Sequence, residues 1–143
     1  MWQVSLELGV EMPEFKTPED AIAADIVKAA FEIHTTLGPG LLESVYVAAL
    51  CHLLRKWGHK VETEVPVRVS FDGVDLGIGF RMDVLVDDLV VVEAKSVEEM
   101  SRNFPKFVHT YVRLSNKKLA LLINFSERVI KNGITRIVNG LEE

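Results

Sequence analysis

Residues 79–96 of the chain read GFRMDVLVDDLVVVEAKS. The segment consists of two nearly continuous apolar runs joined at Asp87-Asp88, which predicts two neighbouring strands covered on both faces. Ionisable residues interrupt the apolar sequence, among them Asp83 in the first run and Glu93 and Lys95 in the second. Because side chains alternate along a strand, Glu93 and Lys95 are expected to share a face.

A hairpin centred on Asp88 places Asp83 directly opposite Glu93, with Cβ atoms about 4.5–5.5 Å apart. Two carboxylates at that spacing repel each other unless a proton or a divalent cation lies between them. Carboxylate oxygens suit hard cations, so the spacing favours a site for Mg²⁺ or Mn²⁺. The spacing alone leaves open an ordinary hairpin whose three charges reach solvent at a strand end.

The sequence on either side of the hairpin carries further motifs. Residues 37–46 read LGPGLLESVY, in which Gly40, Glu43 and Tyr46 form the pattern GxxExxY. An aspartate followed ten residues later by Glu-x-Lys in an apolar strand resembles the PD-(D/E)XK nuclease superfamily. With Ile33-His34 and residues 121–125 and 133–139, the ordered set resembles the GxxExxY family of that superfamily over about residues 20–140.

The resemblance implies an α/β fold with a restriction-endonuclease-like αβββαβ core, in which helices flank a mixed sheet. It also implies a nuclease that uses Mg²⁺ or Mn²⁺ and acts on DNA more readily than on RNA. The implied catalytic residues are Asp83, Glu93, Lys95 and Glu43, and the implied metal ligands are Asp83, Glu93 and the backbone carbonyl of Ala94. Residues expected to bind substrate or support the site are His34, Tyr46, Tyr111 and Arg102.

Several of these residues also have a purely structural interpretation. Glu43 falls in the first turn of a predicted helix, where the helix dipole stabilises a carboxylate. His34 falls near a helix end, where a histidine commonly caps the helix or satisfies a polar group. Tyr111 fits core packing equally well.

One position departs from the superfamily pattern. Members of this type commonly carry a glutamine four residues before the tyrosine of the later helix, where it helps to hold the metal or substrate. Phe107 occupies that position here, before Tyr111. A catalytically inactive nuclease-fold module that binds a nucleic acid or a protein is therefore the second hypothesis.

Length and composition limit the classes of protein that fit. With 143 residues and 48% hydrophobic content, we expect a single domain over residues 17–143, preceded by an arm or extra strand over residues 1–16. The single cysteine, Cys51, excludes an internal disulfide and suits a reducing cytoplasm. We expect no signal peptide and no membrane span. Monomer and homodimer both remain open.

The net charge of −5 argues against general affinity for nucleic acid, but the charge is unevenly distributed. Residues 1–94 hold 7 Lys or Arg and 16 Asp or Glu, whereas residues 95–143 hold 9 and 5. The basic segment starts at Lys95 and includes Arg102, Lys106 and Arg113. The segment either contacts the phosphates of a nucleic acid or forms an ordinary solvated surface.

Local signals predict the remaining elements. Thr17-Pro18 begins a helix to about residue 36, and a second helix runs over residues 41–57. Strands are expected over residues 61–71, from the Asp72-Gly73 turn onward, and over residues 118–125, the last beside the Glu93 strand. A helix is expected over residues 97–114, capped by Ser96 or Ser101. Residues 126–141, divided by Gly133, suit a short helix or a strand.

Overall fold

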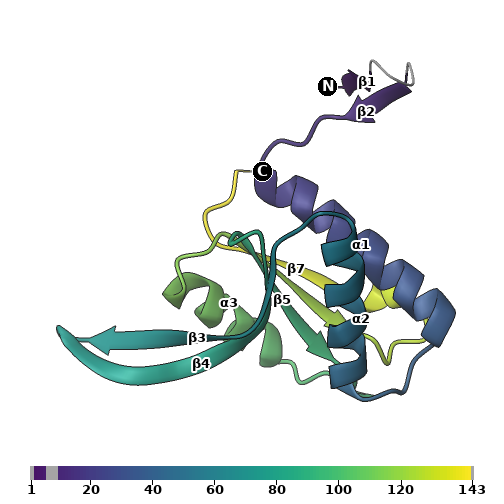
Figure 1. The fold of residues 1–143 in the computed structure, drawn as a ribbon. Coiled ribbons are helices and arrows are strands. Elements are labelled where there is room, and N and C mark those ends of the chain that lie inside the picture. The colour runs from purple at the N-terminus through teal and green to yellow at the C-terminus, as the bar shows by residue number, and fades with distance from the viewer. Residues whose placement is uncertain (1, 6–9, 143) are drawn as a thin grey trace.

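The structure is a computed structural model that describes residues 2–5 and 10–142. Its elements, in chain order, are β1 (Trp2–Ser5), β2 (Val10–Pro13), α1 (Pro18–Leu37), α2 (Glu43–Lys56), β3 (Val61–Phe71), β4 (Val74–Val86), β5 (Val90–Lys95), α3 (Phe104–Leu114), β6 (Leu119–Asn124), the 3₁₀ helix η1 (Ile130–Gly133) and β7 (Ile134–Val138). Helices cover both sides of the central sheet (Figure 1).

The central sheet has five strands in the order β3-β4-β5-β6-β7. Strands β5 and β6 are parallel and the other neighbours are antiparallel, so the sheet is mixed. The α/β fold with its αβββαβ core is confirmed, and the tail adds η1 and the edge strand β7. All six residues of β6 and five of the six of β5 are buried, as their unbroken apolar sequence requires.

Helices α1 and α2 lie on one face of the sheet. Thr17 caps α1 as predicted, because its hydroxyl accepts a hydrogen bond from the Asp20 amide at 3.1 Å. The apolar stripe of α1 packs with α2 onto inward residues such as Val84, Val92 and Ala94. Gly38 and Gly58, both at positive φ, follow the two helices.

Helix α3 lies on the other face, where Val108 and Val112 pack onto Met82, Val91 and their neighbours. The helix begins at Phe104, so the prediction that it starts near residue 97 was wrong. Its N-cap residue is Asn103, which makes no side-chain capping bond, so the predicted serine cap was also wrong.

The late start of α3 has a cause in β6. The side chain of Asn124 accepts a hydrogen bond from the Val97 amide at 3.2 Å and donates one to the Val97 carbonyl at 2.9 Å. Both backbone groups that Val97 would contribute to a helix are therefore engaged with the sheet.

Strands β3 and β4 form a long hairpin that projects beyond the rest of the sheet (Figure 1). The bounds of β3 and the Asp72-Gly73 turn match the prediction. The register shifts between Val67 and Ser70, opposite the glycine-containing part of β4. A side chain at Gly79 would meet the Val69 side chain at 2.3 Å, which explains why a glycine stands there. At the N-terminus, β1 and β2 pair as a separate two-stranded sheet.

Tyr46 ties the start of α2 to the preceding turn. Its fully buried hydroxyl donates to the Gly38 carbonyl at 2.6 Å and accepts from the Leu41 amide at 3.0 Å. Its ring stacks on Phe125, with centroids 4.4 Å apart and an angle of 4° between the rings. One side chain thus holds the Gly-Pro-Gly turn against the sheet.

Tyr46→Phe should lower the free energy of unfolding by about 1–3 kcal/mol, because it keeps the stacked ring and leaves two backbone groups without the hydroxyl. Urea unfolding measures this loss. Tyr111→Phe is the matched control, because the Tyr111 ring also stacks, on Phe80, while its hydroxyl has no hydrogen-bond partner among the described residues. Equal losses in the two variants would contradict the assigned role of the Tyr46 hydroxyl.

His59, in the loop between α2 and β3, links the turn of the β4–β5 hairpin to α1. Its Nδ1 lies 2.5 Å from Asp87 in the hairpin turn, and its Nε2 lies 2.6 Å from Asp25 on α1. The other Asp87 oxygen accepts from the Lys60 amide at 2.8 Å. Burial lowers the pKa of His59, but the hydrogen bonds and charges of Asp87 and Asp25 outweigh it, so the pKa is raised above 6.5.

This arrangement predicts a pH-dependent stability. Folded protein holds the His59 proton more tightly than the unfolded chain, so the stabilisation is complete below about pH 6.5 and is lost as pH rises through the folded pKa. His59→Gln should remove that dependence, which urea unfolding at successive pH values measures. His52→Gln, at an exposed position of α2, should follow the wild type. If the free energy of unfolding depends on pH in the same way in the wild type and in His59→Gln, a charged His59 does not stabilise the fold.

Candidate active site

Asp83 lies where the regular pairing of β4 is interrupted on both sides. Toward β3, the pairs pass from Thr63–Val84 to Val65–Met82, which skips Asp83 and Glu64. Toward β5, the ladder ends at Val84–Val92, one residue before Asp83 and Glu93. The predicted register around Asp88 is therefore confirmed, and it leaves Asp83 at the point where β4 separates from β5.

The alternation of β4 also changes at this point. Met82 packs on the α3 face and Val84 packs on the α1–α2 face, although residues two apart in a regular strand share a face. Glu64, opposite Asp83, has a positive φ of 51°, which is unfavourable for a residue other than glycine. The irregularity turns the Asp83 carboxylate into the gap between β4 and β5, where it accepts from the Ala94 amide at 3.0 Å.

Glu93 is the buried acid of the site, with 4% of its surface exposed. Its Oε1 has no hydrogen-bond partner among the described residues. Burial, then the charge of Asp83 and a hydrogen bond shared with it, raise the pKa of Glu93 to about 9, against which Lys95 acts only weakly. The two carboxylates are thus close enough to share one proton or one cation.

Lys95 is held between two helices. Its Nζ lies 4.3 Å from the centre of the Phe104 ring at the start of α3 and 3.9 Å from Glu43 Oε1 at the start of α2. The aromatic face and the carboxylate therefore both orient the ammonium, each by a modest contribution. Glu43 is the first residue of α2, and its carboxylate points toward Lys95.

Glu43 and Asp83 both line a cleft of about 580 Å³ between α2 and β3. Glu43 and Glu64 along the cleft are exposed to solvent, and Asp83 is half-buried. Substrate could therefore approach the Asp83 carboxylate without displacing an element of the fold.

Two serines that the sequence interpretation missed lie at the carboxyl ends of the parallel strands β5 and β6. The hydroxyl of Ser96 donates to the Leu41 carbonyl at 2.5 Å and lies 3.0 Å from the hydroxyl of Ser126. Their position within two residues of the ends of two parallel strands was the available signal, because such strand ends meet at one edge of a sheet. The serines join the turn before α2 to the end of the sheet that carries Lys95.

The remaining predicted site residues lie farther from the carboxylates. His34 Nε2 lies 2.7 Å from the Glu127 carbonyl, a contact that joins the end of α1 to the loop after β6. Tyr111 stacks on Phe80 with ring centres 4.4 Å apart. Arg102 is exposed in the loop before α3. Phe107, at the position of the expected glutamine, packs edge-on against Phe104 with centroids 6.3 Å apart.

Comparison with known proteins agrees with this geometry. The family model of the PD-(D/E)XK nuclease superfamily matches residues 20–137, which include every residue of the site described above. The chain belongs to the PD-(D/E)XK nuclease superfamily. Comparison with curated proteins gives no match, and comparison with solved structures gives none.

The donors of this PD-(D/E)XK site fit a divalent metal ion. A buried carboxylate oxygen without a partner, beside a second carboxylate, calls for a cation or a proton. Lys95 O accepts from the Phe125 amide at 2.8 Å, so alternation directs the Ala94 carbonyl toward β4 and Asp83. In the part of the chain that the structure describes, no three His, Cys, Asp or Glu side chains form a metal-binding group. A backbone oxygen would therefore complete the protein ligands.

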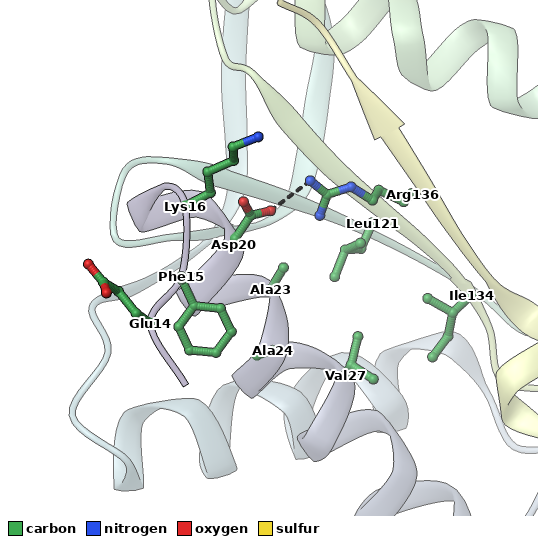
Figure 2. A pocket seen from close by; sticks show the side chains of 10 residues that line it. All are labelled: Glu14, Phe15, Lys16, Asp20, Ala23, Ala24, Val27, Leu121, Ile134 and Arg136. Carbon is green, nitrogen blue, oxygen red and sulfur yellow. Dashed lines mark hydrogen bonds and ion pairs between the residues drawn. The ribbon is translucent and has the colours of Figure 1, made fainter. Parts of the chain in front are cut away.

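A larger hollow of about 640 Å³ lies elsewhere, between α1, β7 and the segment before α1 (Figure 2). Figure 2 shows Phe15, Ala24 and Val27 around it, and an ion pair of 2.7 Å between Arg136 and Asp20 at its rim. None of the predicted nuclease residues lines this hollow. Of the two hollows, the smaller cleft is the one that Glu43 and Asp83 line. No helix among the described residues has the length and apolarity needed to cross a membrane.

The raised pKa of Glu93 predicts how the metal-free protein responds to pH. Between about pH 4.5 and pH 9 the folded protein holds a proton that the unfolded chain releases, so stability falls as pH rises. Glu93→Gln has no such proton, so its stability should not fall in this way. Its free energy of unfolding should therefore rise relative to that of the wild type across the range, by on the order of 1–5 kcal/mol. Unfolding in chelator-treated buffers measures the difference.

The control for this prediction is Glu99→Gln, at an exposed position after β5, which should keep the wild-type profile. Added Mn²⁺ should stabilise the wild type and leave Glu93→Gln nearly unchanged, because the cation takes the place of the proton. Parallel curves for the wild type and Glu93→Gln would show that Glu93 does not hold a proton in the folded state.

Proposed function

We propose that the chain is a metal-dependent nuclease that hydrolyses phosphodiester bonds, with DNA as the substrate. The observation that carries the proposal is the unpartnered, buried Oε1 of Glu93 beside Asp83, with Lys95 two residues further along the same strand. A fold held together only by packing gains nothing from this arrangement, because burying two carboxylates together costs several kcal/mol.

Asp83, Glu93 and the Ala94 carbonyl would hold the Mg²⁺ or Mn²⁺. The Ala94 amide restrains one Asp83 oxygen at 3.0 Å, which leaves the other oxygen for the cation. When bound, such an ion activates water and offsets the negative charge that develops on the phosphate. Glu93 must lose its proton to act as a ligand, so the proton and the cation compete for the same oxygens.

Lys95 would donate a hydrogen bond from Nζ to the attacking water or to a phosphate oxygen. Its ammonium is fixed by the Phe104 ring and lies near Glu43, so little reorganisation is needed when substrate arrives. Phe107 packs against Phe104 and would support the lysine indirectly, in place of the glutamine found in related proteins. Arg102, two residues before Phe104, would contact a neighbouring phosphate.

We also infer that the chain is a member of the GxxExxY family, and the contacts of the three motif residues support this. Gly40 has a φ of 96°, which the turn before α2 requires. Tyr46 bonds two backbone groups of that turn, and Glu43 emerges from it toward Lys95. His34 and Tyr111 would act as supports, through the loop after β6 and through Phe80.

A module that binds nucleic acid without cleaving it is the second candidate. The phenylalanine at position 107 and the net charge of −5 favour it. Some basic residues of the C-terminal half are engaged within the fold, since Lys117 Nζ donates to the Asp88 carbonyl at 2.9 Å and Arg136 pairs with Asp20. The lysine beside the two carboxylates favours catalysis, because binding alone does not need it.

The nuclease proposal predicts cleavage of labelled DNA with Mg²⁺ or Mn²⁺, and binding without turnover with Ca²⁺. Lys95→Ala should reduce cleavage roughly 100-fold or more and leave Mn²⁺ binding nearly intact, because the ammonium contacts water and phosphate and not the cation. Asp83→Ala should remove both. Calorimetric Mn²⁺ titration and a cleavage assay at low salt measure the two properties.

Lys118→Ala, at an exposed position before β6, is the matched control and should cleave like the wild type. Wild-type protein that binds Mn²⁺ but cuts no DNA or RNA would support the binding module. Wild-type protein that binds no divalent cation, even with DNA present, would end the nuclease proposal.

A further inference from the structure

The cleft between α2 and β3 has walls of different character. On the α2 side, Val47, Ala48 and the buried Cys51 form an apolar middle, with Glu43 and Ser44 before it along the helix and Arg55 after it. On the β3 side, Thr63 and Glu64 present a hydroxyl and a carboxylate. A ligand with flat apolar faces and polar edges matches such a pair of walls.

The charge of the cleft disfavours a phosphate group in its interior. Glu43, Glu64 and Asp83 line it with carboxylates, and Arg55 contributes the single basic group among its lining residues. Part of that guanidinium already donates to the Val61 carbonyl at 2.9 Å. Phosphate groups would be repelled from the interior, whereas an uncharged group with N–H donors would be accepted by the carboxylates.

The cleft also adjoins the reacting groups. Asp83 lines it and lies beside Glu93, so an occupant would be next to any phosphate held by a cation on the two carboxylates. Its volume of about 580 Å³ suits one nucleoside together with some water, and α2 and β3 enclose it on two sides. A base that remains paired within a duplex cannot enter such a cleft without leaving its stack.

We propose that this cleft binds one unpaired nucleobase of the nucleic acid being cut. The proposal rests on the proposed nuclease function and narrows its substrate class to single strands, flaps and frayed ends. The base lies against Ala48 and Cys51, and its N–H groups donate to Glu64. The neighbouring phosphate of the same nucleotide then reaches the cation that Asp83 and Glu93 would hold.

The irregular backbone of β3 is consistent with this use. Glu64 adopts a positive φ, and it is skipped in the pairing between β3 and β4. The same irregularity that frees Asp83 from the sheet thus places the Glu64 carboxylate along the cleft. Both ends of the proposed nucleotide, base and phosphate, would be met by residues from one break in the hairpin.

The test is an abasic scan in Ca²⁺ buffer at low salt. Fluorescence anisotropy measures the binding of a short labelled single-stranded DNA and of versions that lack one base at successive positions. Removal of the base at one position should weaken binding roughly tenfold or more, because that base loses its contacts with Ala48, Cys51 and Glu64. The blunt-ended duplex of the same sequence should bind more weakly than the single strand.

Ala48→Trp fills the cleft, so its affinity for intact DNA should fall to that of the wild type for the critical abasic DNA. Removal of a base at any position should then leave the affinity of this variant unchanged. Val45→Trp, on an exposed position of α2 that does not line the cleft, should keep the wild-type profile. Thermal unfolding checks both variants, and Thr63→Trp fills the cleft from β3 if Ala48→Trp does not fold. Glu64→Gln should keep binding and change which base is preferred.

A second readout separates this proposal from the nuclease proposal. Free deoxynucleosides, which carry no phosphate, should show saturation-transfer signals with the wild type and none with Ala48→Trp. A flat scan in a wild-type protein that cleaves DNA with Mn²⁺ would overturn the base site and leave the nuclease standing. Nucleoside binding in a protein that cleaves nothing would overturn the nuclease and keep the base site.

Discussion

The repulsion between the carboxylates of Asp83 and Glu93 is the constraint on which the rest of the structure depends. Glu93 is almost fully buried, and the charge of Asp83 adds to the cost of ionising it. Solvent gives the buried Glu93 carboxylate little relief, whereas Asp83 is half-buried and lines the cleft between α2 and β3. A proton or a cation between the two carboxylates relieves the repulsion.

The surrounding elements hold this unfavourable pair in place by contacts outside it. The His59 bonds to Asp25 and Asp87 hold the turn of the β4–β5 hairpin against α1. On the opposite end of β5, Tyr46 and Ser96 hold the turn before α2 against the sheet. The hairpin is thus restrained at its turn and at its open end, and the separation of β4 from β5 at Asp83 persists between the two restraints.

Elements on both faces of the sheet contribute to the candidate site. Phe104 of α3 lies against Lys95, while Glu43 of α2 and Asp83 line the cleft on the other face. Glu93 is next to Asp83 and on the strand of Lys95. Lys95 joins the two sides, because its ammonium also lies 3.9 Å from Glu43.

Local sequence determined the elements and their order. Val61–Phe71, the Asp72-Gly73 turn, the Thr17 cap and the hairpin centred on Asp88 each follow from a short-range rule of alternation, turn chemistry or capping. The same rules brought Asp83 close to Glu93, because the register of a short hairpin follows from its turn.

Tertiary structure alone decided what completes the site. Glu43 reaches Lys95 from the much earlier helix α2, and Phe104 reaches it from the helix that follows β5. His59 bonds two aspartates from different elements. The local periodicity of the sequence predicts none of these contacts. The start of α3 was mispredicted because Asn124, 27 residues away, holds the backbone of Val97. The change of face at Asp83 depends on packing against helices on both sides of the sheet, and an alternating pattern read along one strand contains no information about it.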